Sequence, residues 1–266
     1  MSNQPPSSGP GRTQESSNTS TYVVVGCAVA GCILVMILAV VVAAGLIMYR
    51  ASAPAREAVK DMKSRNNLRI IAVGINHHQQ TYKRWPASCN AGPDGAPLLS
   101  WRVHLLPFLD EEALYKQFRL DEPWDSEHNQ KLITLIPEVY LSPFSEAEVG
   151  LTTYLGNAVE GGVFTQPADG SSYPTQGLGE YGISDGTANT LLVLEVNDQH
   201  AVPWSKPADF DPEMDTDLFN WLNLRDGGDF NAVYVDGGWY YRGSADDIET
   251  FRAELTREGG EVGKKF

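Results

Sequence analysis

The chain has 266 residues, which is enough for one or two domains, and its hydrophobic content is that of a folded protein. Its formal net charge is −14 at pH 7, so its surface repels phosphate backbones and anionic lipid headgroups. It contains no recognisable nucleic-acid-binding motif. The composition therefore excludes nucleic acid as a partner.

The first part of the chain, residues 1–21, has the composition of a disordered tail. Ser, Pro, Gly, Asn and Gln dominate it, and large apolar side chains are almost absent. Such a segment cannot bury enough apolar surface to offset the entropy lost on ordering. We predict that this tail does not fold.

A long apolar run follows, from Tyr22 to Tyr49, and it contains no charged residue. As a helix it would be about 42 Å long at ~1.5 Å per residue. The hydrocarbon core of a bilayer is only about 30 Å thick. A soluble helix of this length would need a polar face, and this run has none. The sequence therefore predicts a single-pass transmembrane helix over residues 22–49, with the lipid bilayer as a partner.

Two processed forms of this run are alternatives. Val29 to Cys32 resembles a lipoprotein processing box, but in such signals the cysteine closes the apolar region, whereas here a long apolar segment follows it. A cleaved secretory signal is disfavoured by the length of the run and by a leader whose basic residue is Arg12 alone. We expect an uncut signal anchor.

Residues 50–266 are predicted to form a soluble α+β domain that begins with a helix from Arg50 to Tyr82. An apolar stripe recurs at spacings of three and four, which favours packing on a sheet. The stripe consists of Leu68, Ile71, Ile75, His78 and Tyr82. Arg65, Arg69 and Gln79 are expected to face water, and Trp85-Pro86 ends the element.

Short helices and turns are expected in the middle of the chain, followed by strands. The expected elements are a loop at Asn90–Pro97, a helix at Ser100–Leu106, a helix capped by Asp110 and running to Phe118, and a helix capped by Ser126 and ending near Ile136. Strands are expected at Thr152–Val159, at Thr190–Val196, and in a hairpin of Asn231–Val235 and Trp239–Arg242. A closing helix at Asp246–Glu258 would present Ile248, Phe251 and Leu255 on one face. Because Thr190–Val196 is read as continuously apolar, we expect it to be a buried strand.

Several stretches together resemble one known family, the planctomycete-type domain-of-unknown-function family 1559. These are Ala55–Ala58, Asn66–Arg69, Gly74–His78, Leu99–Val103, Leu106–Leu109, Glu112–Tyr115, Leu120–Ser126 with Asn129, Ser184–Thr190 and Val233–Gly238. They occur in the family's order and cover roughly residues 55–262. The resemblance implies a pilin-like fold, in which a long N-terminal helix leans on an antiparallel sheet, and it implies no known catalytic activity.

The chain also departs from that family. Members commonly begin with a prepilin-type leader, in which a basic-Gly-Phe cleavage site precedes an apolar helix carrying a glutamate. No such site precedes Tyr22, and the apolar run contains no glutamate. The family's Cys-Pro-Ser is replaced by Ser142-Pro143-Phe144. These departures argue against prepilin processing and against filament assembly through a buried glutamate.

Histidine and cysteine give no convincing chemical site. Adjacent His77 and His78 would point about 100° apart on a helix, so packed or surface histidines are favoured over half of a metal site. His104, His128 and His200 have no Cys or carboxylate at ligand spacing.

Cys89 is expected in a loop, where a nucleophile is possible. No base accompanies it, so a bystander is favoured. Cys27 and Cys32 lie in the apolar run, which leaves Cys89 no partner for a disulfide within the soluble domain. Serine-hydrolase, zinc-protease and phosphate-loop motifs are absent from the sequence. We predict no enzyme and no catalytic, metal-binding or cofactor-binding residues.

The acidic cluster Asp209, Asp211, Glu213, Asp215 and Asp217 resembles the start of a calcium loop. The sixth position from Asp211 is Thr216 instead of Gly, however, and the twelfth is Leu222 instead of Glu. A solvated loop is therefore favoured. Around Gly186, Asp185 and Asn189 are expected to turn the chain into its buried strand.

These observations favour a non-enzymatic, pilin-like structural or interaction protein of the cell envelope, whose partners are unidentified envelope proteins. The alternative is an extracytoplasmic module that binds carbohydrate or calcium, which exposed Trp204, Trp221 and Trp239 would favour. A hydrolase ranks third. Basic residues after the span place the domain in the cytoplasm by the positive-inside rule, but the family resemblance places it outside. We expect an extracytoplasmic domain.

Overall fold

The structure is a computed structural model, and it describes residues 18–167, 173–174, 176–214, 216–225, 228–242 and 248–259. The chain forms two compact units, Met1–Glu57 and Ala58–Phe266. Most of the predicted tail lies outside the described residues. Its last four residues, however, already belong to a helix, which begins at Asn18 instead of at Tyr22.

Helix α1 (Asn18–Ala51) forms most of the first unit and contains the predicted apolar run. Its large apolar side chains from Ile33 to Tyr49 are exposed. At its end, the Ser52 hydroxyl donates to the Tyr49 carbonyl at 2.8 Å, and the Arg56 guanidinium lies 4.3 Å from the centre of the Tyr49 ring. Within the described part of the chain, this is the helix long and apolar enough to cross a membrane.

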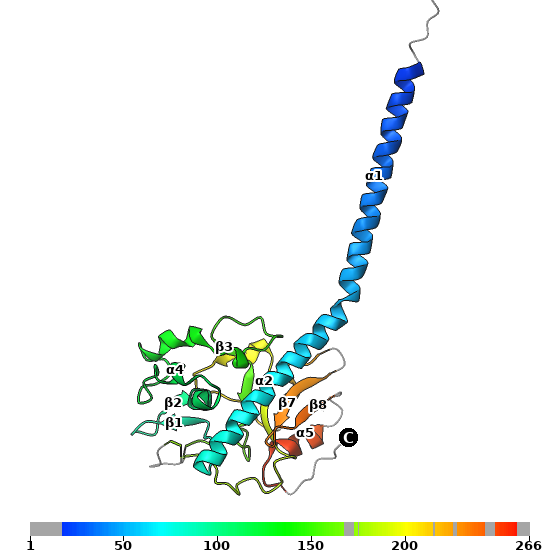
Figure 1. The fold of residues 1–266 in the computed structure, drawn as a ribbon. Helices are drawn as coiled ribbons and strands as arrows, with labels where there is room; N and C mark the ends of the chain where they lie inside the picture. Colours follow the sequence, from blue (N-terminus) through cyan, green and yellow to red (C-terminus); the bar gives the residue numbers. More distant parts are fainter. Residues whose placement is uncertain are drawn as a thin grey trace, which may run out of the picture. The chain divides into compact units, whose positions relative to one another are not determined.

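The second unit is built around helix α2 (Ala53–Tyr82) and a four-stranded antiparallel sheet (Figure 1). The strand order is β4-β5-β7-β8, formed by Tyr154–Gly156, Leu191–Glu195, Phe230–Tyr234 and Trp239–Arg242. Helix α5 (Ile248–Leu255) closes the described part of the unit. The predicted α+β class is confirmed, as is a helix packed on an antiparallel sheet.

Smaller elements fill the connections between these. They are β1 (Cys89–Ala91), β2 (Pro97–Ser100), α3 (Trp101–His104), η1 (Leu106–Phe108), α4 (Glu112–Tyr115), η2 (Asn129–Leu135), η3 (Glu138–Tyr140), β3 (Leu151–Thr152), η4 (Asp198–His200), β6 (Val202–Pro203) and η5 (Leu218–Trp221). Strands β1 and β2 pair antiparallel, and so do β3 and β6.

The sheet is covered on both faces, because successive side chains of a strand point to opposite sides. On β7, Phe230 and Ala232 join the core that contains Phe251 of α5, whereas Val233 joins the core that contains α2. Strand β5 is buried along its whole length, as predicted. The β7-β8 hairpin is also confirmed, and Gly237 in its turn has a φ of 83°.

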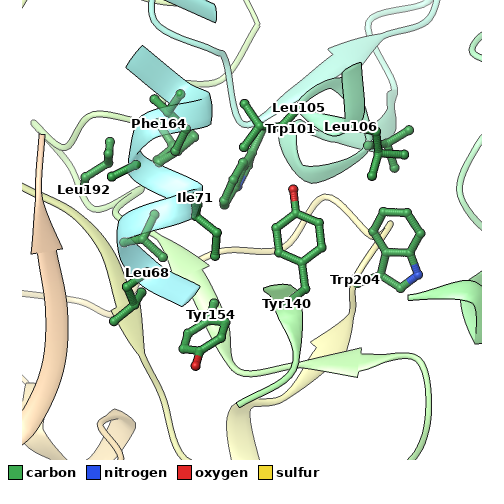
Figure 2. Packing of buried hydrophobic residues seen from close by; sticks show 14 of the residues in the cluster. Leu68, Ile71, Trp101, Leu105, Leu106, Tyr140, Tyr154, Phe164, Leu192 and Trp204 are labelled. Atoms are coloured by element: carbon green, nitrogen blue, oxygen red, sulfur yellow. The ribbon is translucent and has the colours of Figure 1, made fainter. Parts of the chain in front are cut away.

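The buried face of α2 follows the predicted stripe, with one exception. Leu68, Ile71, Ile75 and His78 are buried, but Tyr82 remains partly exposed. Figure 2 shows Leu68 and Ile71 among the aromatic side chains of the core. The same face also buries two polar residues, Ser64 and Asn67, which the apolar pattern did not identify. Their partners decide how α2 is held on the sheet.

A glycine sets how closely α2 approaches the segment that follows α3. A Cβ atom placed on Gly74 would lie 2.9 Å from a methyl group of Leu109 and 3.4 Å from Leu105. A side chain at position 74 would therefore require the Leu109 side chain to move aside.

Two local predictions in the middle of the chain are wrong, and a third holds in part. Of the loop predicted at Asn90–Pro97, residues 92–96 form the connection between β1 and β2, while its two ends belong to these paired strands. Asp110 does not cap α4; it adopts a φ of 61°, and α4 begins after Glu111 without a side-chain cap. The strand expected at Thr152–Val159 is divided into the end of β3 and β4, which pair with different strands.

Two serine side chains accept hydrogen bonds from backbone amides near helix starts. The Ser100 hydroxyl accepts one from the Arg102 amide and so caps α3, which was not predicted. The Ser126 hydroxyl accepts one from the Asn129 amide at 3.1 Å, but the N-cap residue of the 3-10 helix η2 is His128, so the predicted cap at Ser126 is not formed.

The buried stripe can be tested by substitution. Ile75 is fully buried, so Ile75→Ala should lower the free energy of unfolding by about 2–5 kcal/mol through lost transfer energy and a cavity. Arg69 is exposed on the opposite side of α2, so Arg69→Ala should cost less than about 1 kcal/mol. Denaturant titration of both variants measures the difference, and equal losses would contradict the assigned face.

Candidate functional site

One buried polar group accepts hydrogen bonds from several elements: Glu195, at the end of β5. Alternation along the strand turns Leu194 and Val196 toward the α5 side of the sheet, so Glu195 points toward α2. Its side chain is fully buried. The prediction of a continuously apolar strand is therefore wrong at this position, which carries a charge.

Donors from several parts of the chain converge on the Glu195 carboxylate. Oε2 accepts hydrogen bonds from the Ser64 hydroxyl of α2 at 2.8 Å and from the Asn231 amide of β7 at 3.1 Å. Arg225 donates to the same oxygen at 3.1 Å. The hydroxyl of Ser142 donates to Oε1. Ser142 is the residue that replaces the cysteine of the Cys-Pro-Ser segment in the family that the sequence resembles, and here its hydroxyl is a hydrogen-bond donor.

Arg225 links this network to a second carboxylate on α2. One of its terminal nitrogens lies 3.6 Å from Oδ1 of Asp61, and Arg65 pairs with Oδ2 of Asp61 at 2.9 Å. The Arg225 guanidinium also lies 4.4 Å from the centre of the Phe144 ring. These contacts tie α2 to the segment before β7 and to the segment around Phe144.

The network constrains the chemistry of Glu195. Burial raises its pKa, while hydrogen bonds from Ser142, Ser64 and Asn231 and the charge of Arg225 oppose the rise. Both carboxylate oxygens already accept hydrogen bonds from the protein. The arrangement is that of a carboxylate that holds structural elements together.

A second buried pair joins Arg102 of α3 to Asp209. Arg102 donates to Oδ1 of Asp209 at 2.7 Å, and the indole of Trp101 and the amide of Gly156 donate to the same oxygen. Arg102 also donates to the Tyr154 carbonyl at 3.0 Å. Burial raises the pKa of Asp209, and Arg102 opposes that rise.

Because Asp209 is buried and paired with Arg102, it is not part of an exposed acidic loop as predicted. Asp211 and Glu213 are exposed, and Asp217 accepts a hydrogen bond from the Phe219 amide at the start of η5. Asp215 lies outside the described residues. Among the residues that are described, no three His, Cys, Asp or Glu side chains are grouped as metal ligands.

Two of the histidines meet at one tyrosine in the interior. His78 Nδ1 donates to the Arg84 carbonyl at 3.0 Å, so its Nε2 accepts the hydroxyl of Tyr173 at 2.6 Å. The ring of His104 stacks on Tyr173 with 3.9 Å between ring centres, and its Nε2 donates to Asn90 at 2.9 Å. Burial lowers the pKa of His78 to about 4 and that of His104 to about 3. Both rings are therefore neutral packing groups at pH 7.

The other histidines lie apart from this pair. His77 is exposed, and His128 contacts the Gln117 carbonyl through Nε2 at 2.8 Å. His200 stacks on Trp221 with 4.0 Å between ring centres. The structure thus does not join His77 and His78 into a single site.

Cys89 is in β1 and is buried, so its predicted place in a loop is wrong. Burial raises the pKa of its thiol to about 11, which keeps it protonated and a poor nucleophile at pH 7. Trp204 is also buried, and its indole donates to the Ile133 carbonyl. The side chain of Trp239 lies outside the described part of the structure.

The predicted turn before β5 is confirmed. Gly186 has a φ of 95°, and Asn189 donates from its side chain to the Asp185 carbonyl at 2.8 Å. The backbone of Asp185 also donates to the Arg257 carbonyl. This turn therefore joins β5 to the segment that follows α5.

Together these features define an α+β domain with buried, internally bonded polar clusters, preceded by an apolar helix. The family model described as "Protein of unknown function (DUF1559)" matches residues 53–250, and the chain belongs to that family. The resemblance read from the sequence is thereby confirmed. No curated protein and no solved structure matches the chain.

The charge of Glu195 can be tested at pH 7. Glu195→Gln removes one partner of a buried pair, and we expect the free energy of unfolding to fall by about 3–5 kcal/mol. Glu127→Gln is a matched control, because the Glu127 side chain is 94% exposed and should change stability by less than about 0.5 kcal/mol. If both variants unfold at the same denaturant concentration, Glu195 does not act as the ionised partner of Arg225.

Proposed function

We propose that the chain is a non-enzymatic, membrane-anchored, pilin-like protein of the cell envelope that acts through contacts with other envelope proteins. Residues 22–49 anchor it in the bilayer as an uncut, single-pass signal anchor. The folded domain lies on the extracytoplasmic side.

The observation that carries this proposal is the exposed apolar surface of α1. Its side chains from Ile33 to Tyr49 are exposed along their length, and none of these residues is charged. In water such a surface is unfavourable, whereas hydrocarbon solvates it at no cost. A cleaved signal sequence has the same composition, and the intact mass of the chain distinguishes the two forms.

The state of the buried ionisable groups supports a non-enzymatic role. Glu195 and Asp209 bond to donors of the same chain, and His78 and His104 are neutral and packed. Catalytic acids and bases need contact with a substrate in addition to a shifted pKa. These groups stabilise the fold instead. We therefore propose that the protein acts through contacts with other proteins.

The ligand-binding alternative draws no specific support from the described residues. Asp209, which would belong to a calcium loop, is paired with Arg102 inside the core. Trp204, which would belong to a carbohydrate platform, is buried beside Tyr140. We therefore do not propose a ligand.

Removal of the anchor tests the proposal. The full chain should remain in washed membranes, and a variant lacking residues 22–49 should become soluble with an unchanged thermal transition. Intact mass of the membrane-extracted chain should correspond to an uncut leader. A truncated variant that still sediments with membranes would contradict the anchor, and a mature chain starting near residue 22 would contradict the uncut leader.

The side of the membrane can be tested with a thiol reagent that does not cross bilayers. Cys89 is unsuitable because it is buried, so Glu127→Cys provides the exposed thiol. We expect labelling in intact cells, after permeabilisation of an outer membrane where one is present. The parent chain, with Cys89 alone in the domain, is the control. Labelling that appears only after lysis of the inner membrane would place the domain in the cytoplasm.

A further inference from the structure

The side of α2 that faces away from the sheet carries an apolar stripe of its own. Its members recur at spacings of three and four, which places them along one face of a helix. This outer face of α2 consists of Val59, Met62, Asn66, Ile70, Val73 and His77. The exposed fractions of its apolar side chains are 66% for Val59, 71% for Met62, 41% for Ile70 and 45% for Val73. These apolar side chains are therefore not packed in the core of the domain.

The charges beside the outer face of α2 are basic. At 100° per residue, Lys63 lies on one side of the stripe and Arg69 on the other. The acidic residue of α2 within the second unit, Asp61, faces the other way, where it pairs with Arg65 and Arg225. An exposed glutamate, Glu138, reaches Lys63 from η3 at 2.8 Å. The chain as a whole has a net charge of −14, whereas the α2 residues beside this face are basic.

We propose that the outer face of α2 docks on the anionic headgroups of the bilayer in which the chain is anchored. An exposed apolar stripe with Lys and Arg beside it is the pattern of a helix that lies in a membrane interface. The apolar side chains enter the boundary between headgroups and acyl chains, Arg69 contacts lipid phosphate, and Lys63 does so in exchange for its ion pair with Glu138. This inference rests on the membrane anchor proposed above.

The chain between the span and the stripe is short. Val59, at the start of the stripe, lies ten positions after Tyr49, at the end of the span. Ten positions extend over at most about 36 Å and, as a helix, over about 15 Å. The start of the stripe is therefore tethered within that distance of the end of the span, which keeps the lipid at a high effective concentration.

A second copy of the chain is a less favourable partner for the outer face of α2 than the anionic bilayer. In a two-fold α2–α2 contact, whether parallel or antiparallel, a flank of the stripe that carries Lys63 or Arg69 in one copy would face a flank that carries one of these residues in the other copy. Like charges at such positions destabilise a helix pair. Anionic phosphate instead complements both basic residues at once.

The test places an environment-sensitive fluorophore on the outer face in the full chain. Met62→Cys is labelled in a background with Cys27→Ala and Cys32→Ala, because buried Cys89 does not react in the folded protein. The chain is reconstituted at one copy per nanodisc, in neutral phosphatidylcholine or with added phosphatidylserine. A label at Glu127→Cys, on an exposed side chain, is the matched control.

We expect the Met62→Cys label to shift to blue emission in the anionic discs only, and to return toward its aqueous emission at 0.5 M salt, which screens the contact. The double variant Lys63→Gln/Arg69→Gln should reduce the ratio of docked to free domain by roughly tenfold or more, because each basic residue near an anionic surface contributes about a fivefold factor. Lys116→Gln/Lys131→Gln makes the same change of charge on other elements and should leave the shift intact.

Three results would overturn the docking. Equal emission in neutral and anionic discs would show that lipid charge plays no part. A shift that appears only with two copies per disc would assign the outer face of α2 to a second copy of the chain. A chain that does not float with the discs would refute the anchor itself, which is a readout separate from the emission of the label.

Discussion

The fold of the domain depends on the burial of one carboxylate, that of Glu195. A charge removed from water is costly unless donors replace the lost hydration, and here Ser64, Ser142, Arg225 and Asn231 supply them. Apolar contacts between α2 and the sheet are not directional and would tolerate sliding of the helix. The hydrogen bond from Ser64 to Glu195 is directional, so it fixes which turn of α2 lies over the end of β5.

The second buried pair is connected to the first through one residue, Tyr154. Arg102 donates to the carbonyl of Tyr154, while the hydroxyl of Tyr154 donates to Ser64 at 2.9 Å. The Arg102–Asp209 pair on one side of β4 and the Glu195 network beneath α2 therefore share this tyrosine. Because hydrogen-bonded groups in a low-dielectric interior reinforce one another, loss of either charge is transmitted to the other network. The buried polar groups form one connected hydrogen-bond network, here called the buried frame, within the apolar core.

Periodic patterns in the sequence predicted the parts of the fold that local physics decides. The buried side of α2 followed from the spacing of Leu68, Ile71 and Ile75, and the β7-β8 hairpin followed from its Asp-Gly turn. The role of Asp209 could not be predicted, because its partner Arg102 lies 107 residues earlier in the chain. The charge of Glu195 is visible in the sequence and was overlooked in a strand read as continuously apolar, whereas its donors could not be predicted because they come from distant segments. A composition-based reading treats a charge as solvated, and only the tertiary structure shows which charges are paired inside.

The two sides of α2 show why the sequence alone does not reveal which charges of the helix are exposed. In the linear sequence, Lys60, Lys63 and Arg65 are interleaved with Glu57 and Asp61, which makes the segment look balanced. The fold separates these signs, because Arg225 and Arg65 draw Asp61 toward the sheet. Lys63 and Arg69 are left beside the exposed apolar stripe, away from that acid. The same buried frame that holds α2 on the sheet thus determines which charges the helix presents on its outer face, so a change at Glu195 that rotates α2 would also rotate its basic face.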